Sequence, residues 1–577
     1  MVFNKAFQKA ILVKGENMPF IPPESINGDE WESVETDPEQ VPMMYRAQIQ
    51  GRCSLQYGKN NAHLNRWTEE WVYPNQDGTP SSQYTEPQLG LEGSVYRIKV
   101  EFPFRVFSNC GQDSILRPSI STNGLPFIPG SSIKGLFERL SRHPQVNRAL
   151  QKKVKEYCGS IEEPGTLRFH GAYPVGDWAG TKKVELKDNR QENRYRMVDV
   201  VHPQQERQVQ GKGSPKAIAI ISFYQPTFVF ELSSLKPLSD EEWKTITGLL
   251  KRALRKGLGG KTSTGYGLCF IPQDDYPLWV DLKGVGVSPL LRSDEPEFRP
   301  SLFKATLKGH VSRLLAGVCG DETVVKNKIN RLFGYTTEPG ILQLYWENKQ
   351  NFPKYDTHGE ENTPIYENRG ILKLDAPHQE LIFIQKVLEF TYVMAGLGKS
   401  WRRVWHKDFM PSYKTRAIGC HWDWLDSSFD RTAIKNIADL RAFLTQLHAD
   451  MMAYVKVNAN SASYLSWKEA WCPQRLSVYS QVVSQSQAVC LFHDSKFKTT
   501  PAIGGRTSND DRPTSFSFVW HRMLPLPDDR YLEIVTVFHA DRTPWKRQGE
   551  DQLEPFIKAV KSALGEDSHT WGNEPKL

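Results

Sequence analysis

Three short motifs occur twice in this 577-residue sequence and keep the same order in both copies. They are a Lys-Gly pair followed by an arginine, a Glu-Pro-Gly turn, and a Gly-Leu-Gly run that ends a helical pattern. The first copy places them at 134–139, 163–165 and 257–259, and the second at 308–313, 338–340 and 396–398. This repetition predicts two copies of one folding module in tandem, which restricts the fold more than any single motif does.

The predicted elements of the first copy follow the order β-α-β-β-α-β. They are a strand over 96–107, a helix over 124–140, a strand over 166–173, a bent strand or strand pair over 217–232, a helix over 240–256 and a closing strand over 268–272. This order is that of the ferredoxin-like fold, which RNA-recognition domains share. The polar stretch 174–215 is predicted to be an inserted hairpin or a flexible excursion.

The second copy is expected to be built in the same way. A helix over 380–395 enters the second Gly-Leu-Gly run, a further helix spans 432–454, and strands over 476–492 and 515–538 are expected to complete the module. We therefore predict an α+β chain of two ferredoxin-like modules in tandem with inserted loops. The expected boundaries are an N-terminal arm and loop at 1–92, a first module at 93–275, a linker at 276–300, a second module at 301–545, and a C-terminal helix and tail at 546–577.

The overall composition is globular and mildly basic. The net charge of +7 comes from 73 basic and 66 acidic side chains, which permits an anionic partner without requiring one. Eight cysteines are scattered singly, so neither a disulfide framework nor a zinc cluster is predicted. The sequence has no apolar run of about 18 residues, and its N-terminal apolar stretch is too short for a secretory signal. We expect a soluble cytoplasmic protein with no membrane partner.

The stretch 254–267, which reads LRKGLGGKTSTGYG, is the strongest candidate for a binding loop. Glycines let backbone N–H groups approach an anion, and lysines and hydroxyls add charge-assisted hydrogen bonds. A nucleotide-binding P-loop is rejected, because Arg255 stands where its leading glycine should be. A helix C-cap explains Gly257 but not the other glycines, so a clamp on a nucleic-acid backbone is favoured. The predicted contacts are Arg255, Lys256, Gly259, Gly260, Lys261, Thr262, Ser263 and Tyr266.

The Lys-Gly motif of the first copy lies early in a predicted amphipathic helix. Ser131 or Ser132 is expected to cap this helix, and Lys134 lies in its first turn, where free N–H groups and the helix dipole favour phosphate. An ordinary amphipathic helix with a surface lysine explains the pattern equally well. The predicted RNA contacts are Ser131, Ser132, Lys134 and Arg139, with Lys304, Lys308 and Arg313 in the second copy.

The second Gly-Leu-Gly run continues into a segment rich in arginine and tryptophan. Arginine can pair with phosphates through two hydrogen bonds, and tryptophan can stack on bases. The alternative is a tryptophan-rich edge of the core with solvated arginines. Because glycines adjoin the segment, RNA contact is favoured, through Lys399, Trp401, Arg402 and Arg403.

Several of these motifs resemble those of a known family. IPGSSIKG at 128–135 and GLGGKTSTGYG at 257–267 resemble the RAMP superfamily of CRISPR-associated proteins, in its backbone-subunit group. GTLRFHGAYP at 165–174 and VDVVHPQ at 198–204 look most like the terminal RAMP subunit of Cmr-type, type III complexes. In the second copy, FKATLKGHVSRLLAG, LFGY and GLGKSWRR look like a diverged RAMP module, so the chain looks like a two-module fusion.

The resemblance implies a subunit of an RNA-guided type III interference complex. Such a subunit would bind the phosphates of the CRISPR RNA (crRNA) and the duplex of crRNA with target RNA, while base pairing reads the sequence. The implied partners are crRNA, target RNA, the large polymerase-like subunit, and other RAMP and small subunits of the complex.

The resemblance also implies a candidate catalytic residue. Backbone subunits of this group often cut target RNA with an aspartate in the loop before the IPGSS helix, and that loop here holds Asp113. Asp113 would bind Mg²⁺ or orient a 2′-hydroxyl, whereas the alternative role is to form a turn. No other metal site is predicted. A non-catalytic scaffold that caps the 3′ end of the crRNA is the main alternative. A crRNA-processing endoribonuclease would need a histidine near its N-terminus, and the first histidine here is His63.

Overall fold

In a computed structural model the chain divides into two units. Unit 1 comprises residues 1–202, 216–262 and 266–271, and unit 2 comprises residues 203–215, 263–265 and 272–577. The structure describes residues 87–109, 118–121, 125–141, 148–185, 191–201, 205–211, 218–269, 276–291, 295–335, 338–394, 396–456, 463–504 and 517–575. Within these residues, no helix has both the length and the apolar content to cross a membrane.

Unit 1 contains a six-stranded sheet in the order β1-β2-β10-β5-β4-β3. The strands are β1 (Gly90–Glu92), β2 (Val95–Glu101), β3 (Ser119–Ile120), β4 (Pro126–Pro129), β5 (Leu167–Val175) and β10 (Thr227–Ser234). The antiparallel run β2-β10-β5 has the 1-3-2 order of a ferredoxin-like fold. The predicted closing strand is wrong for Leu268 and Cys269, which lie outside any strand, and the hairpin strand β1 pairs beside β2 instead.

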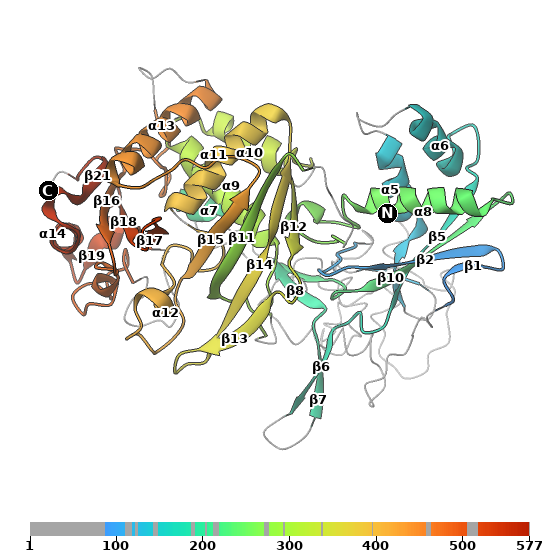
Figure 1. Cartoon of the computed structure of the whole chain (residues 1–577), viewed down its shortest axis with the longest axis horizontal. Helices are drawn as coiled ribbons and strands as arrows, with labels where there is room; N and C mark the ends of the chain where they lie inside the picture. The colour runs from blue at the N-terminus through green and yellow to red at the C-terminus, as the bar shows by residue number, and fades with distance from the viewer. Residues whose placement is uncertain are drawn as a thin grey trace, which may run out of the picture. The chain divides into compact units, whose positions relative to one another are not determined.

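In the described residues of unit 1, three helices pack together: α5 (Gly130–Ser141), α6 (Arg148–Cys158) and α8 (Asp240–Leu254) (Figure 1). Helix α8 begins as predicted, because Ser239 caps it by accepting a hydrogen bond from the Glu242 N–H. The prediction that Ser131 or Ser132 caps α5 is wrong, since β4 feeds directly into a helix that starts at Gly130. A Cβ on Gly130 would lie 1.8 Å from the Phe169 carbonyl oxygen, so only glycine fits at this junction.

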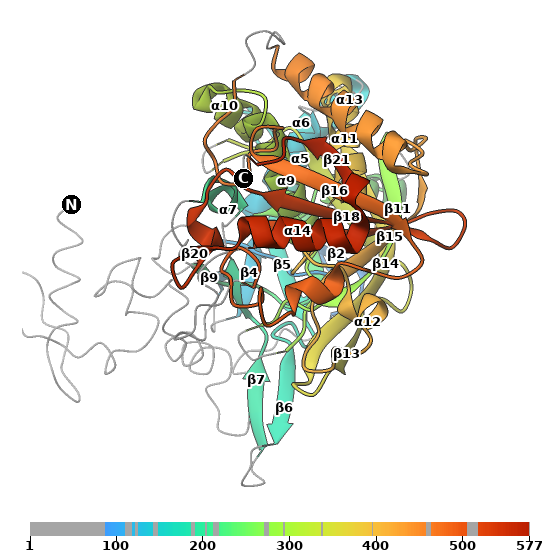
Figure 2. The ribbon, with the colours of Figure 1, turned by 90° about the vertical axis from the view of Figure 1, so that its left-hand side faces the viewer.

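The polar insertion contains a hairpin, which confirms one of the two predictions made for it. Strands β6 (Thr181–Glu185) and β7 (Gln191–Tyr195) pair with each other alone and project from the rest of the ribbon (Figure 2). Strands β8 (Val198–Val201) and β9 (Ile218–Ile221) form a second small ladder. Between them, helix α7 (Gln205–Gln210) belongs to unit 2 and packs on its helix α9.

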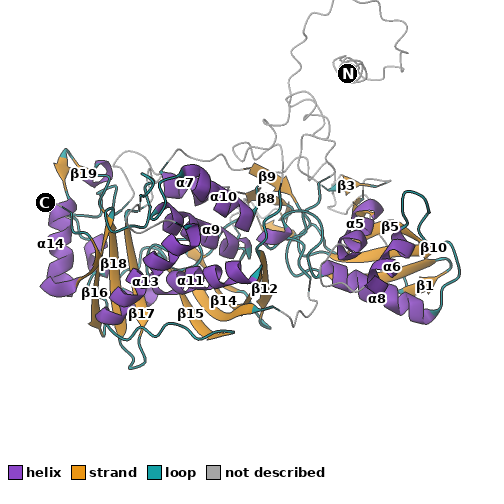
Figure 3. Ribbon diagram, turned by 90° about the horizontal axis from the view of Figure 1, so that it is seen from above, coloured by secondary structure: helices purple, strands orange, loops and turns teal. Residues whose placement is uncertain are grey.

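Unit 2 begins with a complete ferredoxin-like module. Its chain order is β11 (Leu278–Val287), α9 (Ser301–Ala316), α10 (Glu322–Phe333), β12 (Gln343–Asn348), β13 (Lys354–His358), β14 (Thr363–Asp375), α11 (His378–Met394) and β15 (Cys420–Ser427). Its sheet order β12-β14-β11-β15 is the 2-3-1-4 order of that fold, with β13 added on β14. Helices α9, α10 and α11 lie on one side of the sheet (Figure 3). We refer to it as the second module and to unit 1 as the first.

The remaining strands of unit 2 form a third sheet of the same type. After helices α12 (His406–Phe409) and α13 (Ile437–Val455) come β16 (Leu476–Val483), β17 (Val519–Pro525), β18 (Tyr531–Phe538), the short pair β19 (Lys546–Arg547) and β20 (Glu550–Asp551), α14 (Leu553–Leu564) and β21 (His569–Gly572). The order β17-β18-β16-β21 is again 2-3-1-4. The prediction that these strands complete the second module is therefore wrong, because β15 already fills its fourth position; they form a third module.

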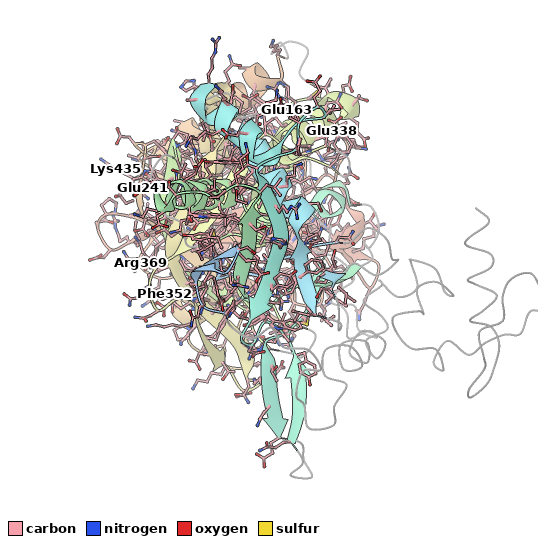
Figure 4. All side chains as sticks on the ribbon, turned by 90° about the vertical axis from the view of Figure 1, so that its right-hand side faces the viewer. Glu163, Glu241, Glu338, Phe352, Arg369 and Lys435 are labelled. Atoms are coloured by element: carbon pink, nitrogen blue, oxygen red, sulfur yellow. The ribbon has the colours of Figure 1, made fainter. Side chains whose placement is uncertain are left out.

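The repeat predicted from the sequence is visible in backbone geometry. After α6, the Ser160 N–H donates to the Glu163 carbonyl at 2.8 Å, and after α10 the Tyr335 N–H donates to the Glu338 carbonyl at 2.9 Å. The glycines that precede these turns have φ values of +82° and +76°. Figure 4 labels the two turn glutamates. The first and second modules thus share one helix-turn-strand connection.

Candidate nucleic-acid interface

The first glycine loop is held rigidly by backbone hydrogen bonds. The Gly260 N–H donates to the Phe107 carbonyl and the Gly267 N–H to the Arg105 carbonyl, both at 2.7 Å. A Cβ on Gly259, whose φ is +79°, would lie 2.3 Å from the Phe107 carbonyl oxygen. Close approach to the segment after β2 therefore requires glycine here, and the Gly260 N–H is not available to a phosphate.

Three cationic side chains border this clamped loop. Arg255, Lys256 and Lys261 are exposed. Thr262 is half-buried, and its methyl group would be 2.6 Å from a Cβ on Gly257. The loop therefore presents charge on a backbone that does not need to reorganise, which suits binding of an anion.

Tyr266 and Ser263 were predicted to contact RNA, and the structure assigns them other roles. Tyr266 is buried and donates its hydroxyl to the carboxylate of Asp199, which is itself fully buried in β8. Ser263 accepts a hydrogen bond of 2.7 Å from the Lys304 ammonium group, and Lys304 is only 8% exposed. Tyr266 anchors the loop. The predicted RNA contact through Lys304 is wrong, because the Lys304 side chain is buried and bonded to Ser263 within unit 2.

Helix α5 exposes most of the polar residues predicted for it. Ser131, Ser132 and Arg139 are exposed, and Lys134 lies 4.0 Å from Glu138 one turn later. The sheet register places the start of α5 near the first half of β2, because Pro129 pairs with Gly171, which lies level with Arg97 across β10. The glycine loop instead bonds to the segment after the end of β2, so the two features lie at different levels of the same module.

Two basic features of unit 1 were missed from the sequence. Helix α6 exposes four cations, and the projecting hairpin exposes two more on β6. They are Arg148, Lys152, Lys153 and Lys155 on the helix, and Lys182 and Lys183 on the strand. The run QKKVKEY has the signal of a basic helix face, and only the absence of a helix assignment at 148–158 hid it.

The second glycine loop repeats the backbone conformation of the first. Gly398 has φ +96° where Gly259 has +79°, and Ser400 has φ +63° where Lys261 has +58°. The structure therefore pairs Lys261 of the first loop with Ser400 of the second. Lys399 takes the place of Gly260 and donates to the Ser288 carbonyl at 3.3 Å.

The arginines and tryptophan after this second loop belong to the core. Arg313 and Arg402 both bind the Glu469 carboxylate, at 2.6 and 2.7 Å, and Arg313 and Glu469 are fully buried. Trp401 is 5% exposed, with the Arg402 guanidinium 4.5 Å from its ring centroid. Burial alone would raise the pKa of Glu469, but the charges of the two arginines outweigh it and hold that pKa at about 2.

Four predicted contacts of the second module are therefore corrected. Arg313, Trp401 and Arg402 cannot reach RNA, because they are packed around Glu469. Arg403 donates to the Ile503 carbonyl at 2.8 Å and to the Ser517 hydroxyl at 2.9 Å, and it also contacts the Val519 carbonyl. Burial, together with the charge of Arg402, lowers the pKa of Arg403 to about 9. Of the remaining predictions in this module, Lys308 is half-buried and Lys399 is exposed.

Residues 110–269 match the family model of the RAMP superfamily, a range that contains α5, the hairpin and the glycine loop. The matched range is a RAMP-superfamily region within a longer chain. A comparison with curated protein sequences found no match. The RAMP range lies within the first module, where the exposed cations of the glycine loop were found.

Three solved structures are similar to parts of this chain. Cmr1 from Pyrococcus furiosus in its apo form has 15% identity and a TM-score of 0.36, and the match covers 51% of this chain and 98% of Cmr1. Cmr6 from Pyrococcus furiosus has 17% identity and a TM-score of 0.20, over 31% of this chain and 100% of Cmr6. A chain of the type III-B Cmr-beta complex bound to cognate target RNA has 23% identity and a TM-score of 0.22, over 30% of this chain and 58% of that chain. At these scores the fold rests on the strand orders described above.

The candidate catalytic residue Asp113 lies outside the described residues. Within the described part of the chain, no group of three His, Cys, Asp or Glu side chains is arranged to hold a metal ion. The described interface is thus a set of exposed cations around a rigid loop, an arrangement that suits an anion.

Proposed function

We propose that this protein is an RNA-binding subunit of a type III CRISPR effector complex, and that its first module binds the crRNA backbone. The observation that carries the proposal is the clamped glycine loop with its exposed border of Arg255, Lys256 and Lys261. Serines in the first turn of α5 supply further hydroxyl and N–H donors in the same module. The RAMP match and the likeness to chains of Cmr complexes support this assignment.

The chemistry of the loop fits binding to phosphates better than reading of bases. Lysine and arginine neutralise phosphates regardless of sequence, and such contacts set register and orientation. Tyr266 and Trp401, the aromatic residues predicted at the two loops, are both buried. Sequence reading is then left to pairing between crRNA and target RNA.

Binding of crRNA to the full chain tests the proposal. The double variant Lys256→Ala/Lys261→Ala is expected to bind a crRNA about tenfold more weakly than the wild type at constant salt, because two phosphate contacts are lost. Lys399→Ala is the matched control, since Lys399 occupies the second loop and bonds to a backbone carbonyl. Equal affinity of the double variant and the wild type would overturn the assignment of the loop.

Cleavage of target RNA is a separate proposal that rests on Asp113. If the subunit cuts, Asp113 would act with Mg²⁺ on the phosphate beside a 2′-hydroxyl. A reconstituted complex with Asp113→Ala should then lose one cleavage product while crRNA binding stays intact. An unchanged set of products would leave the subunit a non-catalytic scaffold of the crRNA.

A further inference from the structure

Helices α5 and α9 are equivalent elements of the first and second modules. The repeated Lys-Gly motif aligns them, and the aligned positions on their inner faces are buried in both. The aligned inner pairs are Ile133 with Leu307, Phe137 with Val311, and Leu140 with Leu314. The outer faces therefore also correspond, with Gly135 matching Gly309 and Arg139 matching Arg313.

On α9 the outer face is covered by a segment of the same unit that carries one lysine and one glutamate. We define residues 463–472 as the strap. The Trp471 N–H donates to the Arg313 carbonyl at 2.9 Å, and the Leu465 N–H donates to the Ala316 carbonyl at 2.8 Å. The strap also supplies Glu469, whose carboxylate binds the Arg313 guanidinium at 2.6 Å.

Helix α7 completes the cover over α9. Its residue Val209 is fully buried, and the Val209 carbonyl accepts a hydrogen bond of 3.0 Å from the Glu469 N–H. Two chain segments thus lie on the outer face of α9, and a glutamate between them neutralises its arginine. Gly309 leaves room for the cover, since it is itself buried.

On α5 the same face is open. A Cβ on Gly135 would meet no atom within 4 Å. Arg139 is exposed, and within the described residues it makes no ion pair. The first module therefore carries the glycine and the arginine of a covered helix, while the described part of the chain supplies no strap for it.

We propose that the Gly135–Arg139 face of α5 is a docking surface for an acidic strap of a neighbouring RAMP subunit, with a carboxylate of that strap bound to Arg139. The occupant is a polypeptide, because the equivalent arginine in this chain binds a glutamate of a covering segment and the equivalent glycine is buried. The basic α6, which packs on α5, adds attraction for an acidic partner. This inference rests on the proposed function, since the partner is another subunit of the same complex.

Two substitutions test the surface in the full chain. Gly135→Leu fills the open space with a good helix former, so the chain should fold while the strap is excluded. Gly248→Leu is its matched control, because Gly248 is also an exposed helical glycine with nothing within 4 Å of its Cβ, on α8. Arg139→Glu repels a carboxylate, and Lys244→Glu is its control, because Lys244 is an exposed lysine on α8.

The measurement is retention of the neighbouring RAMP subunits in the reconstituted complex, with crRNA affinity of the isolated chain measured in parallel. We expect Gly135→Leu and Arg139→Glu to lower retention of one neighbour about tenfold, while both controls match the wild type and Gly135→Leu leaves crRNA affinity within twofold. A photo-reactive benzoylphenylalanine in place of Arg139 should cross-link to an acidic segment of that neighbour.

Other results would overturn the inference. Full retention with both variants would mean that no strap docks on this face. Loss of crRNA affinity by the isolated Gly135→Leu chain, or a cross-link to RNA alone, would assign the face to RNA. These results leave the proposed function standing, whereas a wild-type chain that neither binds crRNA nor enters the complex would overturn the proposed function itself.

Discussion

The two glycine loops have the same backbone and opposite surroundings. In the first, Arg255, Lys256 and Lys261 are exposed around a loop clamped to the segment after β2. In the second, Arg402 binds the buried carboxylate of Glu469, and Trp401 is packed in the core. The comparison indicates that a basic, glycine-rich motif can present its cations to solvent or bind an internal carboxylate, according to its surroundings.

The third module extends this comparison. Its connection from α14 to β21 begins with Gly565, as a glycine follows the second helix in the other modules, but it continues with exposed Glu566 and Asp567. Acidic side chains at this position repel a phosphate backbone. From the first module to the third, the same connection is basic and exposed, then basic and buried, then acidic.

The largest effect is expected from removing the carboxylate of Glu469, which distinguishes the surroundings of the second loop from those of the first. Glu469→Gln removes the carboxylate that binds the fully buried Arg313 and the half-buried Arg402, and should lower the free energy of unfolding by about 3–5 kcal/mol. Urea unfolding followed by tryptophan fluorescence measures it. Glu361→Gln, which breaks the exposed pair with Arg416, should cost at most about 1 kcal/mol. A loss below about 1 kcal/mol for Glu469→Gln would mean that burial of the arginines does not depend on their partner.

A smaller difference is expected between the loop glycines. Gly259→Ala combines positive φ with a Cβ 2.3 Å from a backbone oxygen, and should cost about 3 kcal/mol. Gly398→Ala has similar φ, but its Cβ would lie 2.9 Å from the Tyr366 hydroxyl, the end of a side chain that can shift, so about 2 kcal/mol is expected. Thermal unfolding of both variants shows which of the two is less stable. The reverse order would show that the second loop is the more rigid one.

Acid should weaken unit 2 before unit 1. Burial lowers the pKa of His406 to about 3 and that of His493 to about 4, and their Nε2 atoms lie 2.8 Å apart. Because the folded state resists protonation that the unfolded chain accepts near pH 6.5, stability present above that pH is lost as pH falls toward 4. The slope is at most about 1.4 kcal/mol per pH unit for each histidine, and less for the half-buried His493.

The pH comparison has an internal control. Among the residues described in unit 1 no histidine is buried, so its urea midpoint should move little between pH 7 and 5. His406→Gln should flatten the pH dependence of unit 2. Equal acid sensitivity of the two units would show that the histidine pair does not set it.

The smallest expected effect is on salt dependence. For a single-stranded RNA, each phosphate contact contributes about 0.7 to the slope of log affinity against log salt. Arg255→Ala should therefore reduce that slope by about 0.7, and Lys399→Ala should leave it unchanged. Fluorescence anisotropy of a labelled crRNA gives both slopes. The salt concentration is varied between about 50 and 300 mM, the range over which binding falls steeply. A slope change with Lys399→Ala would restore the second loop to the RNA-binding surface.

Sequence periodicity was enough to predict the ferredoxin-like elements of the first module and the repeat. It could not show the third module, because the first helix of that module is reduced to a short turn at 489–492 and the β-α-β-β-α-β pattern is hidden. Nor could it show that Arg313 is buried, since Glu469 lies 156 residues away along the chain. In the sequence, exposed and buried cations look the same until the position of the distant carboxylate is known.

The position of α7 bears on how the protein can be made in parts. This helix is encoded within the first module, yet Val209 is buried in unit 2 and its carbonyl bonds to the strap. No single cut of the chain separates the units, and a fragment that starts at residue 272 lacks a piece of its own interior. On the ribosome, α7 emerges before any other part of unit 2 that it packs against, so unit 2 can close only after the chain downstream has been synthesised.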